Sequence, residues 1–143
     1  MGIAYRIHKG MGATLVVWDD AITANEFLSH VQRLSSDADW PPAGRLHLSD
    51  LRTATLDASL DERIVEQAAE FYGRQQAKIA NMKVAIVAGI AFQHAVVFER
   101  VLERHGATVI VFNFLDTARK WLNLPSDEVE RTFGQLRAQA KGK

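Results

Sequence analysis

The second half of the chain alternates short apolar runs with helix-like stretches, and this order constrains the fold more than any other feature. Two apolar runs, residues 83–89 and 108–113, each precede a helical pattern, at about 92–104 and 116–122. Such a β-α-β-α order predicts parallel strands joined by crossover helices. Parallel sheets of this kind place their functional loops at the carboxyl ends of the strands, so a site is expected at that edge.

The first half of the chain contributes a hairpin and one more strand. Polar and apolar side chains alternate in residues 3–8, two glycines mark a turn at residues 9–12, and residues 14–18 are apolar on both faces. This pattern predicts a hairpin whose second strand is central. Residues 45–50 alternate again and predict a third strand with one face toward water or a partner. Together these elements predict an α/β fold, with a single mixed, mostly parallel sheet of about five strands and crossover helices on one face.

Two segments have the pattern of a capping box, in which a serine or threonine begins a helix and a glutamate three residues later reaches back to it. One runs from Thr23 to Glu26 and the other from Ser59 to Glu62. Apolar residues recur at helical spacing after each box, so we expect the two helices to end near residues 34 and 79.

A last helix is predicted to begin near Asp127, after Pro125 breaks the chain. Its apolar side chains share one face of the helix at i, i+4 and i+7 spacing: Val129, Phe133 and Leu136. This stripe needs a surface to cover, in its own domain or in another copy, and we expect it to form the interface of a homo-oligomer. The chain thus divides into an α/β domain, residues 1–124, and a C-terminal amphipathic helix with a basic tail, residues 125–143.

Composition excludes several classes of function. The 143 residues suit one domain, and 17 basic residues balance 17 acidic ones, which disfavours a nucleic-acid partner. Without cysteine the chain has neither disulfides nor thiolate catalysis. No apolar run is long enough for a membrane span, and the amino terminus lacks the apolar core of a signal peptide, so we expect a cytoplasmic protein. No two histidines have the i, i+4 spacing of a helical metal site, and we expect no metal or cofactor.

Polar residues and a glycine close three of the predicted strands. Asp50, Gly89 and Asn113 end the third, fourth and fifth strands. Parallel strands bring these positions to one edge of the sheet, where helix amino termini favour an anion. Arg52 adds positive charge there, and His94, in the first turns of the next helix, is the histidine best placed for ligand or acid–base work. The alternative is that these residues simply end strands and begin turns.

Three segments carry a resemblance to a known family: residues 82–87, the helix that contains Phe98, and residues 109–122, which end Asp-Thr-Ala-Arg-Lys-Trp-Leu. The chain resembles STAS domains (sulfate transporter and anti-sigma-factor antagonist) and, more closely, the SpoIIAA-like bacterial proteins. The resemblance implies a cytoplasmic regulatory or ligand-binding module, often without catalysis. Classical antagonists carry a phosphorylatable Asp-Ser-Ser-Gly segment, and this sequence lacks it, because Ser49 precedes Asp50 rather than following it.

These observations predict a non-enzymatic regulatory or ligand-binding module that acts through its strand-end loops and through protein–protein contacts. Its partner is a protein or a small ligand whose identity the sequence does not give. The alternative is a small enzyme at the same edge, with Asp50 and His94 as its acid–base pair. A deep pocket and a close approach of these two side chains would favour the enzyme, and a flat edge would favour the interaction module.

Overall fold

One sheet lies at the centre of the residues that the computed structural model describes, 2–73 and 79–141. Its five strands follow one another in space in chain order. They are β1 (Ile3–His8), β2 (Ala13–Ile22), β3 (Leu46–Leu56), β4 (Lys83–Ala88) and β5 (Thr108–Phe112). β1 is antiparallel to β2, and all other neighbours are parallel. The predicted mixed, mostly parallel sheet of about five strands is confirmed.

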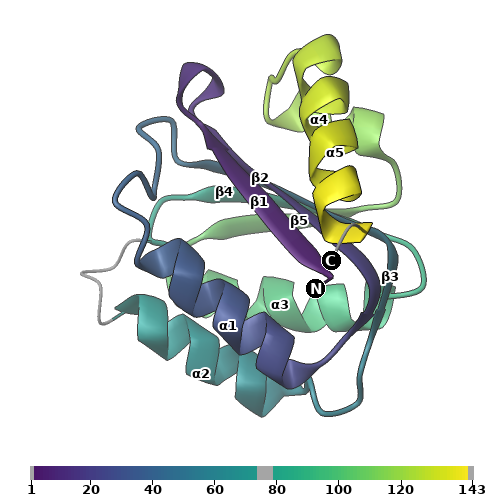
Figure 1. Ribbon diagram of the computed structural model, residues 1–143. Helices are drawn as coiled ribbons and strands as arrows, with labels where there is room; N and C mark the ends of the chain where they lie inside the picture. The colour runs from purple at the N-terminus through teal and green to yellow at the C-terminus, as the bar shows by residue number, and fades with distance from the viewer. Residues whose placement is uncertain (1, 74–78, 142–143) are drawn as a thin grey trace.

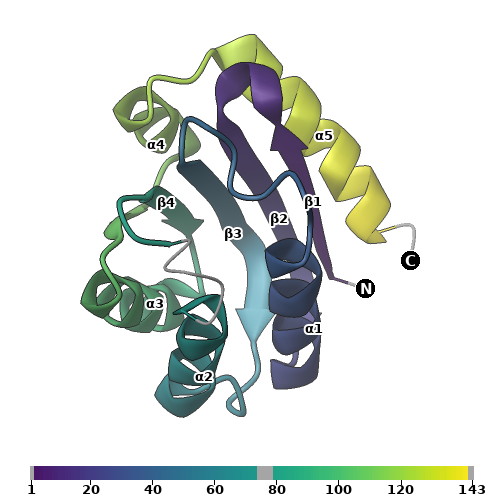
Figure 2. The same ribbon diagram turned by 90° about the vertical axis from the view of Figure 1, so that its left-hand side faces the viewer.

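Helices cover both faces of this sheet (Figure 1). Within the described ranges, α1 (Ala24–Ser35), α2 (Glu62–Gly73) and α3 (Phe92–Arg104) lie on one face, and α4 (Leu115–Trp121) and α5 (Ser126–Lys141) lie on the other. We call these the three-helix face and the two-helix face. Successive right-handed crossovers in one direction place their helices on the same side, as expected for the first three. Figure 2 shows α1 and α5 on opposite sides of β1 and β2.

The turn between β1 and β2 has the geometry that its glycines allow. A single turn of 3₁₀-helix, Lys9–Met11, ends at Gly12, whose φ of 64° lies in the left-handed region. A side chain there would also collide with Gly44, because a Cβ atom on Gly12 would lie 2.8 Å from the Gly44 Cα. Glycine is therefore needed at this position both for its backbone conformation and for a close approach of two chain segments. The predicted hairpin is confirmed.

Two strands run further than their apolar patterns predict. β2 continues past Trp18 to Ile22, and β3 continues past Asp50 to Leu56. Beyond Leu51, β3 pairs only with β2, so the two form a ribbon that extends past β4. Such a ribbon tolerates polar side chains because it is not enclosed between helices, and this is why the polar residues there do not end the strands. The expectation that Asp50 closes the third strand is wrong, because this residue lies in its middle.

The helix starts confirm one capping box and correct the other. The Thr23 Oγ1 atom accepts from the Glu26 backbone N–H at 3.2 Å, and a Glu26 carboxylate oxygen accepts from the Thr23 N–H at 3.3 Å. At α2, the Asp61 carboxylate rather than Ser59 accepts from the backbone, at the Ile64 N–H. The predicted continuation of this helix to residue 79 falls partly on residues 74–78, which lie outside the described residues.

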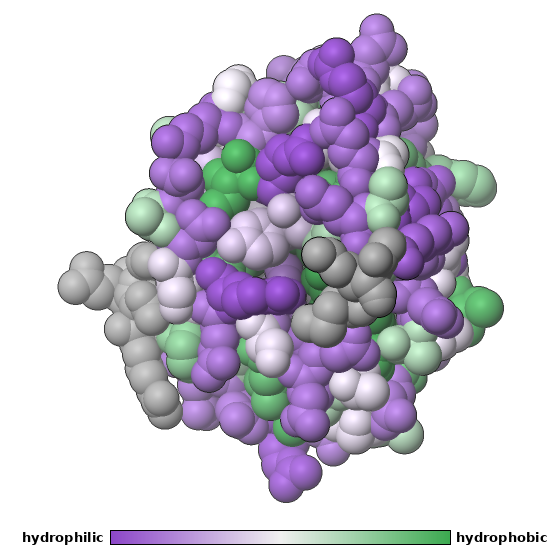
Figure 3. Space-filling view, viewed as in Figure 1, coloured by the Kyte–Doolittle hydropathy of each residue, from purple (hydrophilic) through white to green (hydrophobic). Residues whose placement is uncertain are grey.

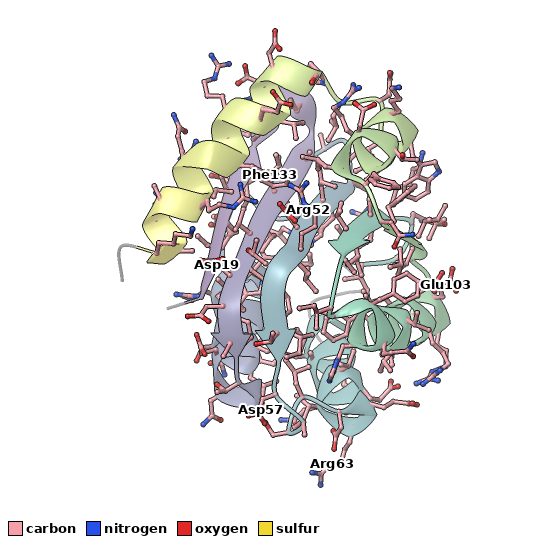
Figure 4. All side chains as sticks on the ribbon, turned by 90° about the vertical axis from the view of Figure 1, so that its right-hand side faces the viewer. Asp19, Arg52, Asp57, Arg63, Glu103 and Phe133 are labelled. Carbon is pink, nitrogen blue, oxygen red and sulfur yellow. The ribbon has the colours of Figure 1, made fainter. Side chains whose placement is uncertain are left out.

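Each face of the sheet has its own apolar cluster. On the two-helix face, α5 lies against β1 and β2, and three side chains of its stripe, Val129, Phe133 and Leu136, belong to the apolar cluster of this face and are at most 2% exposed. Figure 4 shows Phe133 between α5 and the strands. The stripe therefore finds its cover within the same chain, which corrects the expectation that these residues form an interface between copies.

None of the helices among residues 2–73 and 79–141 is both long enough and apolar enough to cross a lipid bilayer.

Candidate functional site

A cavity of about 80 Å³ lies between the sheet and the helices of the three-helix face. Its wall includes side chains from β2, β3 and β4, from α1, α2 and α3, and from the loop after α1. Its aromatic and imidazole side chains are Trp18, Phe27, His30, Trp40, His47 and Phe98. Protein interiors contain few voids larger than a water molecule. A partly enclosed cavity of this volume is therefore a departure from close packing that a site can use.

Helical spacing places His30 over the cavity. The buried stripe of α1 contains Phe27, Val31 and Leu34. His30 follows Phe27 by three residues and precedes Leu34 by four, so it lies on the same face of the helix. It is only 4% exposed, although histidine is usually found at or near protein surfaces. His30 is buried because it lies in the stripe. Its imidazole is polar, whereas the side chains of Phe27, Val31 and Leu34 are apolar.

Two polar atoms in the cavity wall have no hydrogen-bond partner among the described residues: Nδ1 of His30 and Nε1 of Trp18. Both residues are at most 4% exposed, and their ring centroids are 6.2 Å apart. Leaving a buried polar group without a partner costs about 1–3 kcal/mol. A pair of such groups on one cavity wall is what a bound molecule with a polar atom would satisfy.

The strand side of the cavity carries a second polar pair. Nε2 of His47 and Oγ of Ser49 are 2.9 Å apart, two residues from each other on β3, so both side chains point to the same face of the sheet. One face of this strand was expected to meet water or a partner, but the face that carries His47 and Ser49 lines the cavity under the helices of its own chain. Thr14, opposite His47 on β2, is fully buried, and its hydroxyl has no partner among the described residues.

Both cavity histidines are held in the neutral form. Burial lowers the pKa of His30 to about 3, with smaller contributions from the charges of His47 and Arg33. Burial lowers the pKa of His47 to about 4. At neutral pH the cavity wall therefore presents two uncharged imidazole rings.

Aromatic rings form one wall of the cavity. Phe27 and Phe98 stack with centroids 5.5 Å apart and planes 9° apart. The ring centroid of Trp18 is 5.7 Å from the centroid of each of these rings. Interlocked aromatic rings lose little freedom on folding and hold their shape, so they give this wall a fixed surface for an apolar ligand.

The predicted strand-end residues do not gather into one site. Asp50 is 1% exposed and points to the two-helix face, where its carboxylate accepts from Arg52 Nε at 2.9 Å and from Arg137 of α5 at 2.5 Å. Burial acts to raise the pKa of Asp50, but hydrogen bonds from Arg52 and the charges of Arg52 and Arg137 hold it below its usual value. Figure 4 shows Arg52 on this side of the sheet. The cluster clamps α5 onto β3.

The other predicted positions lie on three different segments, and only one of the three is placed next to the Asp50 cluster. Gly89 lies beside Arg52, since a Cβ atom on Gly89 would be 3.2 Å from the Arg52 carbonyl oxygen. Asn113 is exposed just after β5, which neighbours β4. His94 is on α3, which covers the three-helix face, whereas the Asp50 carboxylate points to the opposite face. The acid–base pair expected for an enzyme is therefore divided by the sheet.

The strand-end edge carries an apolar feature that sequence analysis did not identify. Ile90, after β4, is 83% exposed, and Phe114, after β5, is 71% exposed. These residues follow neighbouring strands, so the two loops lie at the same edge. By contrast, the face of the molecule in Figure 3 is mostly hydrophilic, with hydrophobic side chains in small separate areas.

The described residues contain no group of three or more histidine, aspartate or glutamate side chains arranged to hold a metal ion. The donor atoms in the cavity wall are two neutral imidazoles, a hydroxyl and indole N–H groups. Such a set fits hydrogen bonding to an organic molecule better than it fits a hard cation, which prefers several oxygen ligands.

The arrangement of strands and helices defines an α/β domain of the SpoIIAA-like type, as the sequence resemblance indicates. A solved structure of similar fold is that of an uncharacterized DUF3478-family protein with a SpoIIAA-like fold from Shewanella loihica PV-4. The match has a TM-score of 0.54 and 18% sequence identity, and it covers 85% of this chain and 94% of that one. No protein-family model and no curated protein sequence matches the chain. The likeness therefore shows the fold.

Proposed function

We propose that this chain is a non-enzymatic binding module that takes a small, mostly apolar molecule into the cavity of the three-helix face. The observation that carries the proposal is the pairing of an apolar cavity with unpartnered polar atoms on His30 and Trp18. Ligand sites are typically apolar hollows with a few polar groups that fix orientation. The cavity has both features.

The energetic argument supports a ligand over a packing defect. An unfilled cavity of about 80 Å³ costs the fold about 2 kcal/mol at the usual dependence on cavity volume. The unpartnered imidazole and indole add to this cost. A bound molecule offsets both contributions, because it restores van der Waals contacts and supplies hydrogen bonds.

The chemistry of the polar groups supports binding rather than acid–base catalysis. The hydrogen bond between His47 and Ser49 has the form of a base beside a nucleophile. However, a histidine whose pKa is lowered to about 4 is a weak base at neutral pH. Asp50 and His94, the pair that an enzyme was expected to use, belong to opposite faces of the sheet.

A matched pair of substitutions tests the proposal. Ala69→Leu adds a side chain that fills the cavity, whereas Ala95→Leu makes the same change on α3 at a buried position that does not line it. Methyl NMR spectra are recorded under increasing xenon pressure, since xenon occupies apolar cavities. We expect shifts at Val31 and Val65 in the unmodified protein and in Ala95→Leu, and their loss in Ala69→Leu.

Methyl groups of the two-helix face serve as the internal control in this experiment. Val129 and Leu136 are fully buried in the other cluster and should not respond to xenon. If xenon shifts both clusters equally, or if Ala69→Leu leaves the response of Val31 unchanged, then the cavity is not a binding site and the proposal is wrong.

We propose second that the strand-end loops mediate protein contact, specifically with another copy of the chain. Ile90 and Phe114 expose most of their apolar surface at this edge. An apolar patch is complementary to itself, so a two-fold contact can bury it in both copies. The formal net charge of zero adds no repulsion between copies.

Sedimentation velocity tests this contact directly. The double variant Ile90→Ser, Phe114→Ser should sediment as a monomer at concentrations at which the unmodified chain associates. Ile110→Ser, an exposed apolar change within β5, is the matched control and should leave association intact. A monomeric unmodified chain at high concentration would contradict the proposal.

A further inference from the structure

We infer that the ligand of the cavity is an uncharged, compact molecule, or the uncharged end of a larger one, that carries a single hydroxyl or carbonyl group. The inference rests on the proposed binding function and adds the chemical class of the ligand. It follows from three properties of the cavity wall: its lack of charge, its two unpartnered polar atoms, and its size.

The lack of charge excludes ionised ligands. No lysine, arginine, aspartate or glutamate is among the described residues that line the cavity. The two histidines that do line it, of which His30 is buried and His47 half-buried, are neutral at physiological pH because desolvation lowers their pKa. A carboxylate or phosphate bound there would lose its hydration without gaining a counter-charge, which is strongly unfavourable. The wall therefore selects for a neutral molecule.

The unpartnered atoms define the number and kind of polar groups. The indole N–H of Trp18 can only donate, so its partner must contain an acceptor. Nδ1 of His30 accepts or donates according to the tautomer of the ring. A hydroxyl group satisfies both atoms by accepting from Trp18 and donating to His30, and a carbonyl oxygen satisfies both when Nδ1 carries the proton.

A ligand with several polar groups fits less well. His47 and Ser49 already bond to each other at 2.9 Å, so neither needs a ligand atom. The rest of the wall is mostly aliphatic and aromatic. Each further hydroxyl of a polyol would therefore lie against apolar side chains and lose its hydrogen bonds to water.

The volume sets the size of the buried part. The cavity, about 80 Å³, is smaller than the engineered 150 Å³ cavity known to bind benzene. The buried part of the ligand is thus at most about the size of a five-atom branched alcohol. The polar end of the molecule enters the cavity, because the unpartnered atoms are in its wall.

Three probes of nearly the same shape test the inference: isobutanol, isopentane, in which a methyl group replaces the hydroxyl, and isobutyrate, which is charged. NMR titration of the protein gives the dissociation constant of each. We expect isobutanol to bind at least 100-fold more tightly than isobutyrate. We also expect isobutanol, but not isopentane, to shift the indole N–H of Trp18 and the ring nitrogens of His30, with Trp121 on the other face as the reference.

Substitution of His30 separates hydrogen bonding from shape. His30→Leu should weaken isobutanol binding about tenfold and leave isopentane binding within twofold, because only the alcohol loses a partner. His30→Gln keeps a polar group and should restore most of the affinity for isobutanol. It also provides a second variant if the leucine variant does not fold.

The outcomes distinguish this inference from the function on which it rests. If xenon or isopentane binds while isobutyrate binds as tightly as isobutanol, or while His30→Leu weakens both neutral probes equally, the cavity is a binding site but the assigned ligand class is wrong. Failure of isobutanol to bind where xenon does bind has the same meaning. If no probe binds, xenon included, both the ligand class and the proposed function are overturned.

Discussion

Helices pack on the two faces of the sheet in different ways. On the two-helix face, Phe133 and Leu136 of α5 pack against the sheet. The buried carboxylate of Asp50, on β3, accepts hydrogen bonds from two guanidinium groups. On the three-helix face, α1–α3 enclose a cavity with an imidazole and an indole nitrogen that have no hydrogen-bond partner in the part of the chain that the structure describes. The first face is held by apolar packing and an ion-paired cluster, whereas the second has unfilled volume that the proposed ligand would occupy.

Under the proposed function, the three-helix face binds the ligand and the two-helix face provides stability. Close packing and the ion pairs of Asp50 make the two-helix face a support that tolerates little change. Unfilled volume and unpartnered polar atoms on the three-helix face lower stability, and proteins commonly accept such a cost at a site that binds a ligand. The predictions below test this division, from the largest effect to the smallest.

Removal of the Asp50 carboxylate should have the largest effect. Asp50→Ala leaves Arg137 and Arg52 close together without their counter-charge, and breaking a buried ion pair in this way costs about 4 kcal/mol. The free energy of unfolding is measured by urea denaturation. Asp116→Ala is the control, because its ion pairs with Arg119 and Lys120 are exposed and should contribute less than about 1 kcal/mol. Equal losses in the two variants would show that the buried cluster does not hold α5 in place.

Truncation of the α5 stripe should come next. Leu136→Ala removes a fully buried side chain and should lower the free energy of unfolding by about 3 kcal/mol. Since the stripe packs within its own chain, this loss should be the same at low and high protein concentration. A loss that grows as the protein is diluted would mean that Leu136 stabilises an assembly instead, as the sequence suggested.

The cavity histidines should give a smaller, pH-dependent effect. In the unfolded chain each titrates near its ordinary pKa of 6.5, but in the fold the values are about 3 and 4. Between these limits the unfolded state binds more protons, so the free energy of unfolding falls as pH is lowered from 6.5 toward 4. From pH 6.5 to 5 we expect about 2 kcal/mol per histidine.

The variant His30→Leu checks this assignment, because its stability curve should be flatter over the same range of pH. The pKa of Asp50 is also lowered in the fold, but from an ordinary value of 3.8, so its contribution is lost only at more acidic pH. A curve that is flat between pH 6.5 and 5 in the unmodified protein would contradict the burial of neutral histidines.

The order of the helices and strands can be predicted from the sequence because it depends on signals between neighbouring residues in the chain. The two glycines at residues 10 and 12, the box from Thr23 to Glu26 and the alternation of apolar runs all depend on neighbours in the chain. The ends of β2 and β3 were missed because a ribbon of two strands has no apolar signature of its own. The expectation that the α5 stripe contacts another copy is wrong, because a helix pattern does not say which chain covers it.

The candidate site was harder to predict than the fold. The position of His30 in the α1 stripe was a usable signal, because Phe27, Val31 and Leu34 surround it at helical spacing. The alternation of β3 likewise places His47 and Ser49 on one face of the sheet. It does not say which face of the sheet the helices cover. The cavity itself is unfilled space between three strands and three helices, and its size depends on their separation, which no local pattern encodes.

The tethering of α5 to the first strands has a consequence for biosynthesis. Arg6 bonds to Gln135, 129 residues later in the chain, and Nε2 of His8 lies 3.0 Å from a carboxylate oxygen of Glu128, 120 residues later. Because translation proceeds from the amino terminus, β1 and β2 emerge long before the helix that covers them. The nascent two-helix face therefore exposes Leu15 and Val17 until α5 has been made. A chain truncated before α5 should aggregate or recruit chaperones during synthesis rather than fold to a stable intermediate.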